Sequence, residues 1–196
     1  MTPAEALRAG FPVVLPFDTV YGLAVEPHNE ASTRRLYELK GRPPTQPTAL
    51  VAASVEALAA CLPELDTTIA WHLFPGPLTL VVPNPARRFL WLTGTNPDAL
   101  GVRVPDLAGA AQAVLEEIGT VAATSANLPG GPDPRRLEEV PDTIRAGAAA
   151  VVDAGEMPGT PSTVVDVTGA EPRVLREGAV PAAEVLRRLQ AAVRSS

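Results

Sequence analysis

Residues 13–25 read Val13-Val14-Leu15-Pro16-Phe17-Asp18-Thr19-Val20-Tyr21-Gly22-Leu23-Ala24-Val25. Residues 13–15 form a short β-branched and apolar run, and a second such run covers residues 21–25, which predicts two strands. The loop between them, residues 16–19, carries a carboxylate and a hydroxyl group. It is a candidate functional site, because binding residues concentrate on loops that a rigid scaffold positions.

Helix signals lie on both sides of this pair of strands. Thr2-Pro3-Ala4-Glu5 forms a capping box with proline at the first helical position, and a glycine ends that short helix. Residues 31–40 suit an amphipathic helix, which Gly41 and the two prolines that follow stop. Lys40 and Arg42 are therefore expected at a helix exit.

The rest of the chain alternates strands with helices. Further strands are expected at residues 49–53, 78–82, 101–104, 121–123, 149–152, 163–167 and 173–175, and further helices at 54–60, 67–73, 109–118, 137–145 and 181–193. Several connections are too short for parallel crossovers, which predicts a mixed sheet. No internal repeat or shift in composition marks a linker. We therefore expect residues 1–196 to form a single α/β domain, a twisted mixed sheet flanked by helices.

The composition limits the class of protein. The chain has 196 residues, 46% of them hydrophobic, and a net charge of −6, which indicates a soluble globular protein and argues against indiscriminate nucleic-acid binding. No stretch reaches the roughly 18 apolar residues of a membrane span, and the N-terminus begins a helix rather than a signal peptide. The expected location is the cytoplasm, with no membrane partner.

Cysteine and histidine are scarce in the sequence. Cys61 is the one cysteine, which excludes an internal disulfide and a cysteine-based zinc site. The two histidines, His28 and His72, are far apart and offer no metal-ligand spacing. Cys61 and His72 are interpreted as core or surface residues, and no protein metal site is predicted.

Lys40 is the one lysine among 16 lysine and arginine residues. An ammonium is a compact charge with three donors, whereas a guanidinium is a planar fork, so a lysine kept among arginines suits a separate task such as gripping a phosphate. A cation in the last turn of a helix also suits the helix dipole. Both interpretations of Lys40 stand at this point.

Familiar nucleotide-binding signatures are absent from the sequence, which has neither a G-x-x-x-x-G-K-[ST] phosphate loop nor a G-x-G-x-x-G turn. A phosphate site would therefore need scattered cations and small hydroxyl or amide residues at loop starts. The candidates are Thr19, Lys40, Arg42, Arg103, Ser125, Asn127, Ser162, Thr163 and Arg176. Arg103 stands out, because a charge in an apolar strand is seldom buried without a partner.

Six segments, taken together, resemble motifs of the YrdC-type family, whose typical members are threonylcarbamoyl-adenylate synthases. They are Pro16-Phe17-Asp18-Thr19-Val20-Tyr21-Gly22-Leu23, Lys40-Gly41-Arg42-Pro43, Phe74-Pro75-Gly76-Pro77-Leu78-Thr79-Leu80-Val81, Val102-Arg103-Val104-Pro105, Thr124-Ser125-Ala126-Asn127, and Ser162-Thr163-Val164-Val165-Asp166 with Leu175-Arg176-Glu177-Gly178. They follow the family's order with nearly the family's spacing. The resemblance covers residues 10–180.

The resemblance implies a twisted α/β sheet with a basic concave groove, and a reaction that joins L-threonine, bicarbonate or CO2, and ATP into threonylcarbamoyl-AMP and pyrophosphate. The product would serve threonylcarbamoyladenosine modification of tRNA at position 37, through downstream threonylcarbamoyl transferase proteins. Mg²⁺ is expected with ATP, held chiefly by the nucleotide. Longer family members add a C-terminal domain, so this chain is expected to be the short form, a catalytic domain alone.

The matching motifs imply roles for individual side chains. The residues expected to bind ATP are Lys40, Ser125, Asn127 and Arg176. The residues expected at threonine are Phe17, Thr19, Ser162 and Arg103, the last on the carboxylate. The expected catalytic residues are Lys40, Arg42 and Arg103. Cations suit this reaction because the substrate supplies the nucleophile, so the protein must position anions and neutralise charge.

Three positions depart from the family pattern. Phe17 stands where threonine is usual, Gln46-Pro47-Thr48 replaces Asn-Pro-Leu, and Pro129 replaces a serine. The hydroxyl that Phe17 lacks would lie near the amino-acid substrate. In one interpretation Thr19 or a backbone group fills the gap. In the other, the chain is a paralogue that handles a carbamoyl-adenylate with a different acceptor.

Two other classes of function are weaker alternatives. A non-catalytic module for double-stranded RNA or tRNA would use Arg34, Arg35, Lys40 and Arg42, but the net charge of −6 and the 4% aromatic content weigh against it. A serine hydrolase with Ser125 as nucleophile needs a histidine base. Neither histidine has a sequence context that suggests one.

Overall fold

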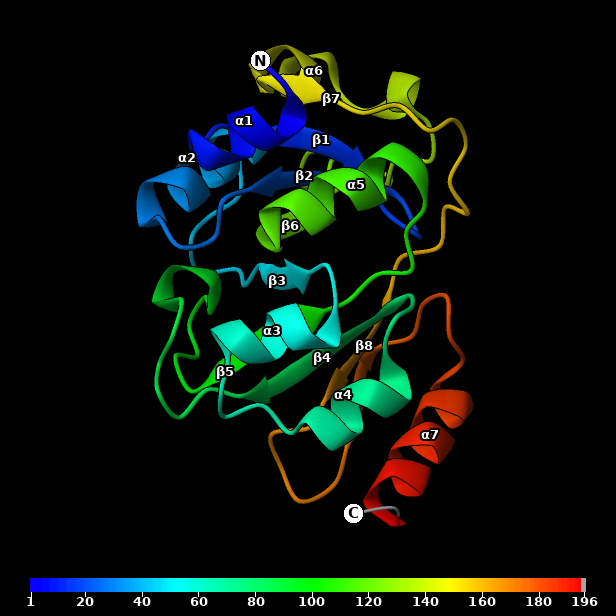
Figure 1. Ribbon diagram of the computed structural model, residues 1–196. Coiled ribbons are helices and arrows are strands. Elements are labelled where there is room, and N and C mark those ends of the chain that lie inside the picture. The colour runs from blue at the N-terminus through cyan, green and yellow to red at the C-terminus, as the bar shows by residue number, and fades with distance from the viewer. Residues whose placement is uncertain (195–196) are drawn as a thin grey trace.

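The computed structural model describes residues 1–194 and contains a nine-stranded sheet flanked by helices (Figure 1). The strands are β1 (Val13–Pro16), β2 (Tyr21–Val25), β3 (Ala49–Ala52), β4 (Leu78–Pro83), β5 (Ala99–Arg103), β6 (Thr120–Ser125), β7 (Ala150–Val151), β8 (Thr163–Asp166) and β9 (Arg173–Arg176). The helices are α1 (Pro3–Arg8), α2 (Glu30–Lys40), α3 (Val55–Cys61), α4 (Thr67–Leu73), α5 (Gly109–Ile118), α6 (Asp142–Gly147) and α7 (Ala182–Arg194), with short 3-10 turns η1 (Leu90–Leu92) and η2 (Leu137–Glu139).

The strand order is β7-β1-β2-β6-β3-β5-β4-β8-β9. The pairs β1–β2, β2–β6, β3–β6, β4–β5 and β8–β9 are antiparallel, whereas β1–β7, β3–β5 and β4–β8 are parallel. Pro16 pairs with Tyr21, so residues 17–20 form the loop of the first hairpin. The predicted α/β class and mixed sheet are confirmed.

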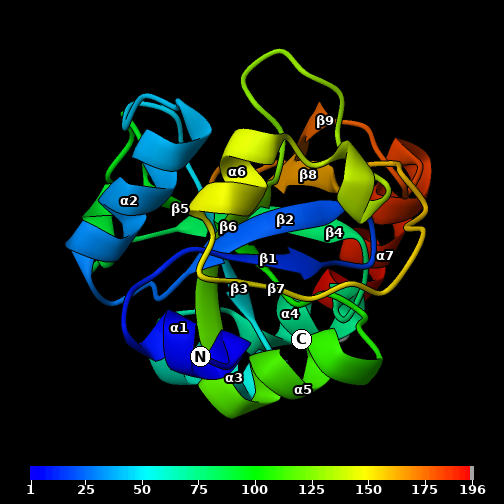
Figure 2. The same ribbon diagram turned by 90° about the horizontal axis from the view of Figure 1, so that it is seen from above.

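Each face of the sheet has its own hydrophobic core, because successive side chains of a strand point to opposite faces. Helices α2, α3, α4, α6 and α7 bury their apolar side chains in one core, through Leu36, Leu58, Leu73, Ile144 and Leu189. Helices α1 and α5 bury Leu7 and Leu115 in the other. Seen from above, α1 and α5 lie on one side of β1 and β2, and α6 lies on the other (Figure 2). Burial of each such leucine stabilises the fold by about 1.5–3 kcal/mol.

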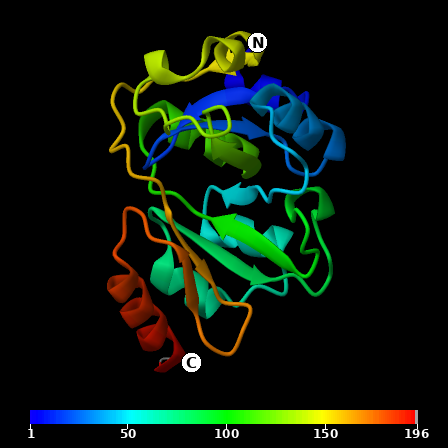
Figure 3. The same cartoon turned by 180° about the vertical axis from the view of Figure 1, so that it is seen from behind.

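Strands β4, β5 and β8 are covered by helices on one face, and their other face is open in the view from behind (Figure 3). In β4, Leu78 and Leu80 are buried in the core under α4 and α7, while Thr79 and Val81 point the opposite way and are half-buried. This alternation leaves a shallow apolar and polar floor on which small molecules can lie.

The predicted elements agree with the observed ones to within two residues at each end, apart from one helix. The helix expected at residues 137–145 is η2 followed by α6, because Pro141 lies between them and disfavours helical backbone in the residue before it. The strand expected at 121–123 extends through Ser125, so this residue ends β6 rather than following it. None of the helices within residues 1–194 is both long and apolar enough to cross a membrane.

Candidate functional site

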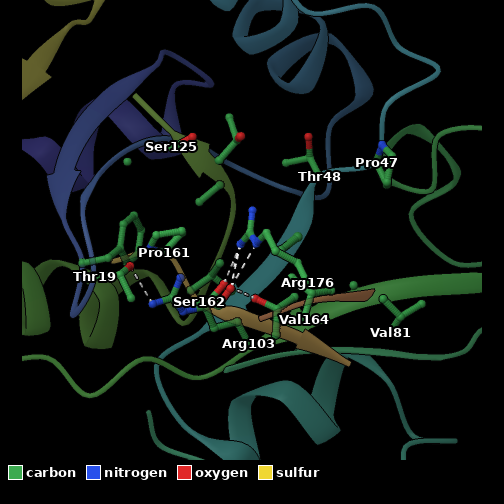
Figure 4. Close-up of a pocket in the computed structure, with 18 of the residues that line it drawn as sticks. Thr19, Pro47, Thr48, Val81, Arg103, Ser125, Pro161, Ser162, Val164 and Arg176 are labelled. Atoms are coloured by element: carbon green, nitrogen blue, oxygen red, sulfur yellow. Dashed lines mark hydrogen bonds between the residues drawn. The ribbon is translucent and has the colours of Figure 1, made fainter. Parts of the chain in front are cut away.

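A cavity of about 440 Å³ occupies the open face, between the β1–β2 loop, β6 and the strands β3, β4, β5 and β8 (Figure 4). Strands β4, β5 and β8 line it with every second residue: Thr79 and Val81 from β4, Gly101 and Arg103 from β5, and Val164 from β8 with Ser162 just before that strand. The cations that line it are Arg42, Arg103 and Arg176, and the one lining carboxylate among the described residues is Asp133. Among the charged residues that line the cavity, arginines therefore outnumber carboxylates three to one, which suits anionic ligands.

Arg103, at the end of β5, is held by the β1–β2 loop. Its Nη2 donates to Asp18 Oδ1 and, at 3.0 Å, to Thr19 Oγ1 (Figure 4). Both charged side chains are nearly buried, with 11% of Arg103 and 9% of Asp18 exposed. Burial lowers the pKa of Arg103, and the Asp18 carboxylate opposes that shift. Arg103 Nε is buried without a hydrogen-bond partner, so the guanidinium keeps donor capacity for a ligand.

Arg176 joins the same end of the cavity from β9. Its Nη2 donates to the carbonyl oxygen of Ser162 at 2.8 Å and to Ser162 Oγ at 3.3 Å. The Ser162 hydroxyl also lies 2.9 Å from Thr79 Oγ1. Arg176 is near enough to Arg103 to lower its pKa further. Two guanidinium groups and two hydroxyls thus converge here.

Lys40 forms the other end of the site, at the last turn of α2. Its side chain is buried, and Nζ donates to the carbonyl oxygen of Ser125, to Asn127 Oδ1 at 2.8 Å and to Ser125 Oγ at 3.4 Å. Ser125 Oγ also donates to Asn127 Oδ1 at 2.7 Å. Ser125 lines the cavity, so the ammonium lies directly behind its wall. Gly41 has φ 67° and ends α2 directly after this lysine in the left-handed conformation.

The pKa of Lys40 is well below that of an ordinary lysine. Burial and, to a smaller extent, the positive charge of Arg42 lower it from 10.5 to about 8, and Asp133 opposes them. Burial likewise lowers the pKa of Arg42. Arg42 donates to Thr124 Oγ1 at 2.9 Å and to the carbonyl oxygen of Pro47, which fixes its guanidinium beside Lys40.

Phe17 lies under the cavity and in the second core. Its side chain is 5% exposed, and the ring lies against Gly22, where an added Cβ would be only 2.4 Å from Cε2. The Arg103 guanidinium carbon lies 5.9 Å from the ring centroid. Phe17 is therefore an apolar floor beneath Arg103, and Gly22 is the residue that makes room for it.

The structure gathers the candidate residues into two groups. Lys40, Arg42, Ser125 and Asn127 lie at one end, and Phe17, Thr19, Arg103, Ser162 and Arg176 lie at the other. Arg176, expected with ATP, hydrogen-bonds Ser162, expected with threonine. Thr163 points the opposite way, into the core, where its Oγ1 donates to the carbonyl oxygen of Val180 at 2.6 Å. It is not part of the site.

Asp18, Thr79 and Thr124 contribute to the site although the sequence did not single them out. Asp18 could have been identified from the sequence. An arginine inside an apolar strand requires a buried acid, and Asp18 stands in the loop that was already a candidate site. Nothing in the sequence distinguishes Thr79 and Thr124 as site residues, because threonine is common in strands. Their hydroxyls become informative only when register places them beside Ser162 and Arg42.

This arrangement is suited to positioning anions but offers no activated nucleophile. Neither His28 nor His72 lines the cavity, so Ser125 lacks the histidine base of a serine hydrolase. Among residues 1–194 no group of three or more histidine, cysteine or acidic side chains is placed to hold a metal ion.

The chain matches one protein-family model and several curated proteins. The family model is Sua5_yciO_yrdC, described as "Telomere recombination", and it matches residues 5–178. The threonylcarbamoyl-AMP synthase of Pyrococcus abyssi is 35% identical over 186 residues, which are 93% of this chain and 54% of that protein. The putative threonylcarbamoyl-AMP synthase of Mycobacterium tuberculosis is 35% identical over 181 residues, 89% of this chain and 82% of that protein.

A solved structure shares this fold. The crystal structure of P. abyssi Sua5 complexed with L-threonine matches with a TM-score of 0.85 and 33% identity, over 95% of this chain and 56% of that one. The chain thus spans about half the length of the Pyrococcus protein and most of the length of the mycobacterial one.

Proposed function

The chain belongs to the Sua5_yciO_yrdC family, and on this basis we propose that it is a threonylcarbamoyl-AMP synthase. It would form threonylcarbamoyl-AMP and pyrophosphate from L-threonine, bicarbonate or CO2, and ATP. The observation that carries the proposal is the cavity with a buried arginine at one end and, directly behind its wall at the other end, a buried lysine. Two anionic substrates need two such anchors.

The Arg103 end suits the amino acid. The carboxylate of threonine would lie on the free donors of Arg103, which Asp18 and Thr19 hold in place. Ser162 and Thr79 present hydroxyls for the polar groups of the substrate. The related P. abyssi structure is complexed with L-threonine, which supports an amino-acid site in this fold.

The Lys40 end suits the phosphates of ATP. The ammonium would contact them as a compact charge, and Ser125 and Asn127 orient it. Arg42 adds a second fixed charge nearby. Arg176 lies at the Ser162 end, where it would reach the nucleotide only if ATP extends along the whole cavity. The basic groove remains our proposal, supported by three lining arginines.

The chemistry needs positioning more than an enzyme nucleophile. The amino nitrogen of threonine adds to CO2 and gives a carbamate, whose oxygen attacks the α-phosphorus while the bond to pyrophosphate breaks. Negative charge grows on the leaving group, and fixed cations stabilise it without reorganising. Mg²⁺ would enter with ATP and neutralise phosphate charge. The product would pass to proteins that modify tRNA, in the cytoplasm.

Pyrophosphate release tests the proposal. The protein is incubated with ATP, Mg²⁺ and bicarbonate, with L-threonine, with serine, or with neither. We expect release that depends on threonine. Pyrophosphate release at the same rate with and without threonine would favour a paralogue that handles a carbamoyl-adenylate. Binding of double-stranded RNA or tRNA without any pyrophosphate release would favour the non-catalytic module.

The pKa of Lys40 predicts a pH dependence of ATP binding. The ammonium loses its proton as the pH rises through about 8, so the Kd for ATP should rise by up to about tenfold per pH unit above that value. The folded chain holds fewer protons at Lys40 than the unfolded chain between about 8 and 10.5, so this group's contribution to stability rises with pH there.

Isothermal titration calorimetry with ATP from pH 7.5 to 10 measures this effect. Lys40→Arg is the matched control, because arginine stays charged throughout that range. Its Kd should not change with pH. A constant Kd in the wild-type protein would contradict the placement of Lys40 at the nucleotide.

Phe17→Thr tests the departure from the family pattern. Removing the buried ring should lower the free energy of unfolding by about 3–5 kcal/mol, as for phenylalanine-to-alanine changes in cores. Threonine dependence should persist in both proteins, because Thr19 already provides a hydroxyl beside Arg103. Chemical denaturation and pyrophosphate release give the two measurements. Threonine dependence that appears only in the variant would identify the wild-type chain as a paralogue.

A further inference from the structure

A second cluster of reactive side chains lies away from the cavity, around His28. Its Nδ1 is 2.8 Å from Glu26 Oε1, and its Nε2 is 3.8 Å from the sulfur of Cys61. Cys61 is partly exposed, and 57% of the His28 side chain is exposed. A thiol, an imidazole and a carboxylate in this order form the nucleophile, base and orienting group of covalent catalysis.

The imidazole is held in place by its surroundings. Glu26 Oε1 accepts from the backbone N–H of His28 at 2.7 Å as well as from the ring. The indole N–H of Trp91 donates to the carbonyl oxygen of Pro27 at 2.8 Å, and the ring of Phe89 meets the imidazole edge-on, with centroids 5.3 Å apart. The loop before α2 is therefore anchored on both sides of His28.

This anchoring sets the tautomer of His28. With Glu26 accepting from Nδ1–H, the lone pair of Nε2 faces the Cys61 thiol and can take its proton. Cys61 is the last residue of α3, where the helix dipole disfavours an anion. A thiolate at this position therefore depends on the imidazolium of His28. The hydroxyl of Thr120, 3.9 Å from the sulfur, is the other polar group beside it.

The cluster is separate from the cavity. Glu26 and His28 follow the end of β2 that points away from the cavity, and Thr120 begins β6, which ends at the cavity with Ser125. Five residues of strand separate those two positions by about 17 Å. None of the cluster residues lines the cavity, so the proposed synthase reaction leaves them unused.

We propose that Cys61, His28 and Glu26 form a thiol site that reacts with small hydroperoxides. The thiolate sulfur attacks one peroxide oxygen, the O–O bond breaks and an S–O bond forms. The leaving oxygen takes the proton held by His28 and departs as water or an alcohol. Sulfur is oxidised by two electrons to a sulfenic acid, and the peroxide is reduced.

The fate of the sulfenic acid follows from the composition. The sequence has one cysteine, so an internal disulfide is impossible. A low-molecular-weight thiol would attack the sulfenic sulfur, release water and leave a mixed disulfide on Cys61, which a further thiol reduces. The site is thus a reversible modification site for peroxide and a small thiol.

Kinetics of sulfenic-acid formation with hydrogen peroxide test this proposal. A diketone trap and intact-protein mass spectrometry follow the reaction, and the single cysteine makes the mass change unambiguous. The folded protein should react at least about tenfold faster than the protein unfolded in guanidinium at the same pH, because a positioned base takes the thiol proton as the sulfur attacks. His28→Gln should abolish that difference, and Glu26→Gln and Thr120→Val should reduce it.

His72→Gln is the matched control, since this exposed histidine lies on α4 and its Nδ1 bonds the carbonyl oxygen of Thr68. It should leave the rate unchanged. Circular dichroism checks the fold of each variant. If His28→Gln does not fold, the reaction rate of Glu26→Gln is the test of the proposal. Equal rates in folded and unfolded wild-type protein, or wild-type rates in the folded cluster variants, would overturn the proposal.

Discussion

Replacing Lys40 by alanine is expected to lower threonine-dependent pyrophosphate release by about 100- to 1,000-fold, the effect of removing one fixed donor from a developing negative charge. The ammonium is buried and donates to Ser125 and Asn127 beside the cavity, and alanine leaves no donor at this place. Steady-state kinetics of the purified variant gives the measurement. Loss should appear in kcat as well as in the KM for ATP.

Stability must be measured beside activity, because Lys40 also satisfies buried acceptors. Its removal leaves the Ser125 carbonyl and Asn127 Oδ1 without that donor, at a cost of about 1–3 kcal/mol. Lys40→Arg keeps the charge but changes its shape, and it should retain more activity than Lys40→Ala. An alanine variant that folds and turns over ATP at the wild-type rate would exclude Lys40 from the reaction.

Arg103→Gln is expected to raise the KM for threonine by at least about 100-fold, since a charge-assisted contact to a carboxylate and its geometry are lost together. It should also lower the free energy of unfolding by about 3–5 kcal/mol, because Asp18 is left as an unpaired buried charge. Threonine titrations and chemical denaturation measure the two effects separately.

The double variant Asp18→Asn with Arg103→Gln separates binding from folding. Removing the charge of Asp18 should restore much of the lost stability, because no unpaired carboxylate remains. The KM for threonine should stay high, because the guanidinium is still absent. A double variant that binds threonine like the wild type would show that Arg103 only supports the loop that contains Asp18.

The sequence was enough to predict the strands and helices because their signals are local. The capping box at Thr2 and Glu5 begins α1, and Gly41 ends α2 in the left-handed conformation, both as expected. The motif resemblance also anticipated the family. The break between η2 and α6 was missed because Pro141 was not taken as a helix boundary.

Contacts between distant segments lay beyond sequence reasoning. The position of Arg103 in an apolar strand indicated that its charge needs a partner, but only the fold identifies that partner as Asp18, 85 residues away. Arg176 was grouped with ATP by its motif, and the pairing of β8 with β9 places it on Ser162. Cys61 and His28 are 33 residues apart in the sequence. Their contact likewise depends on the fold, which places the end of α3 beside the loop that follows β2.

The identity of the reaction product tests the central proposal most directly. The wild-type protein is incubated with isotopically labelled bicarbonate, ATP, Mg²⁺ and L-threonine, and the quenched mixture is analysed at once by mass spectrometry. The proposed function predicts threonylcarbamoyl-AMP that carries one labelled carbon and disappears when threonine is omitted. A labelled adenylate that lacks threonine, or hydrolysis of ATP with no labelled adenylate, would contradict it.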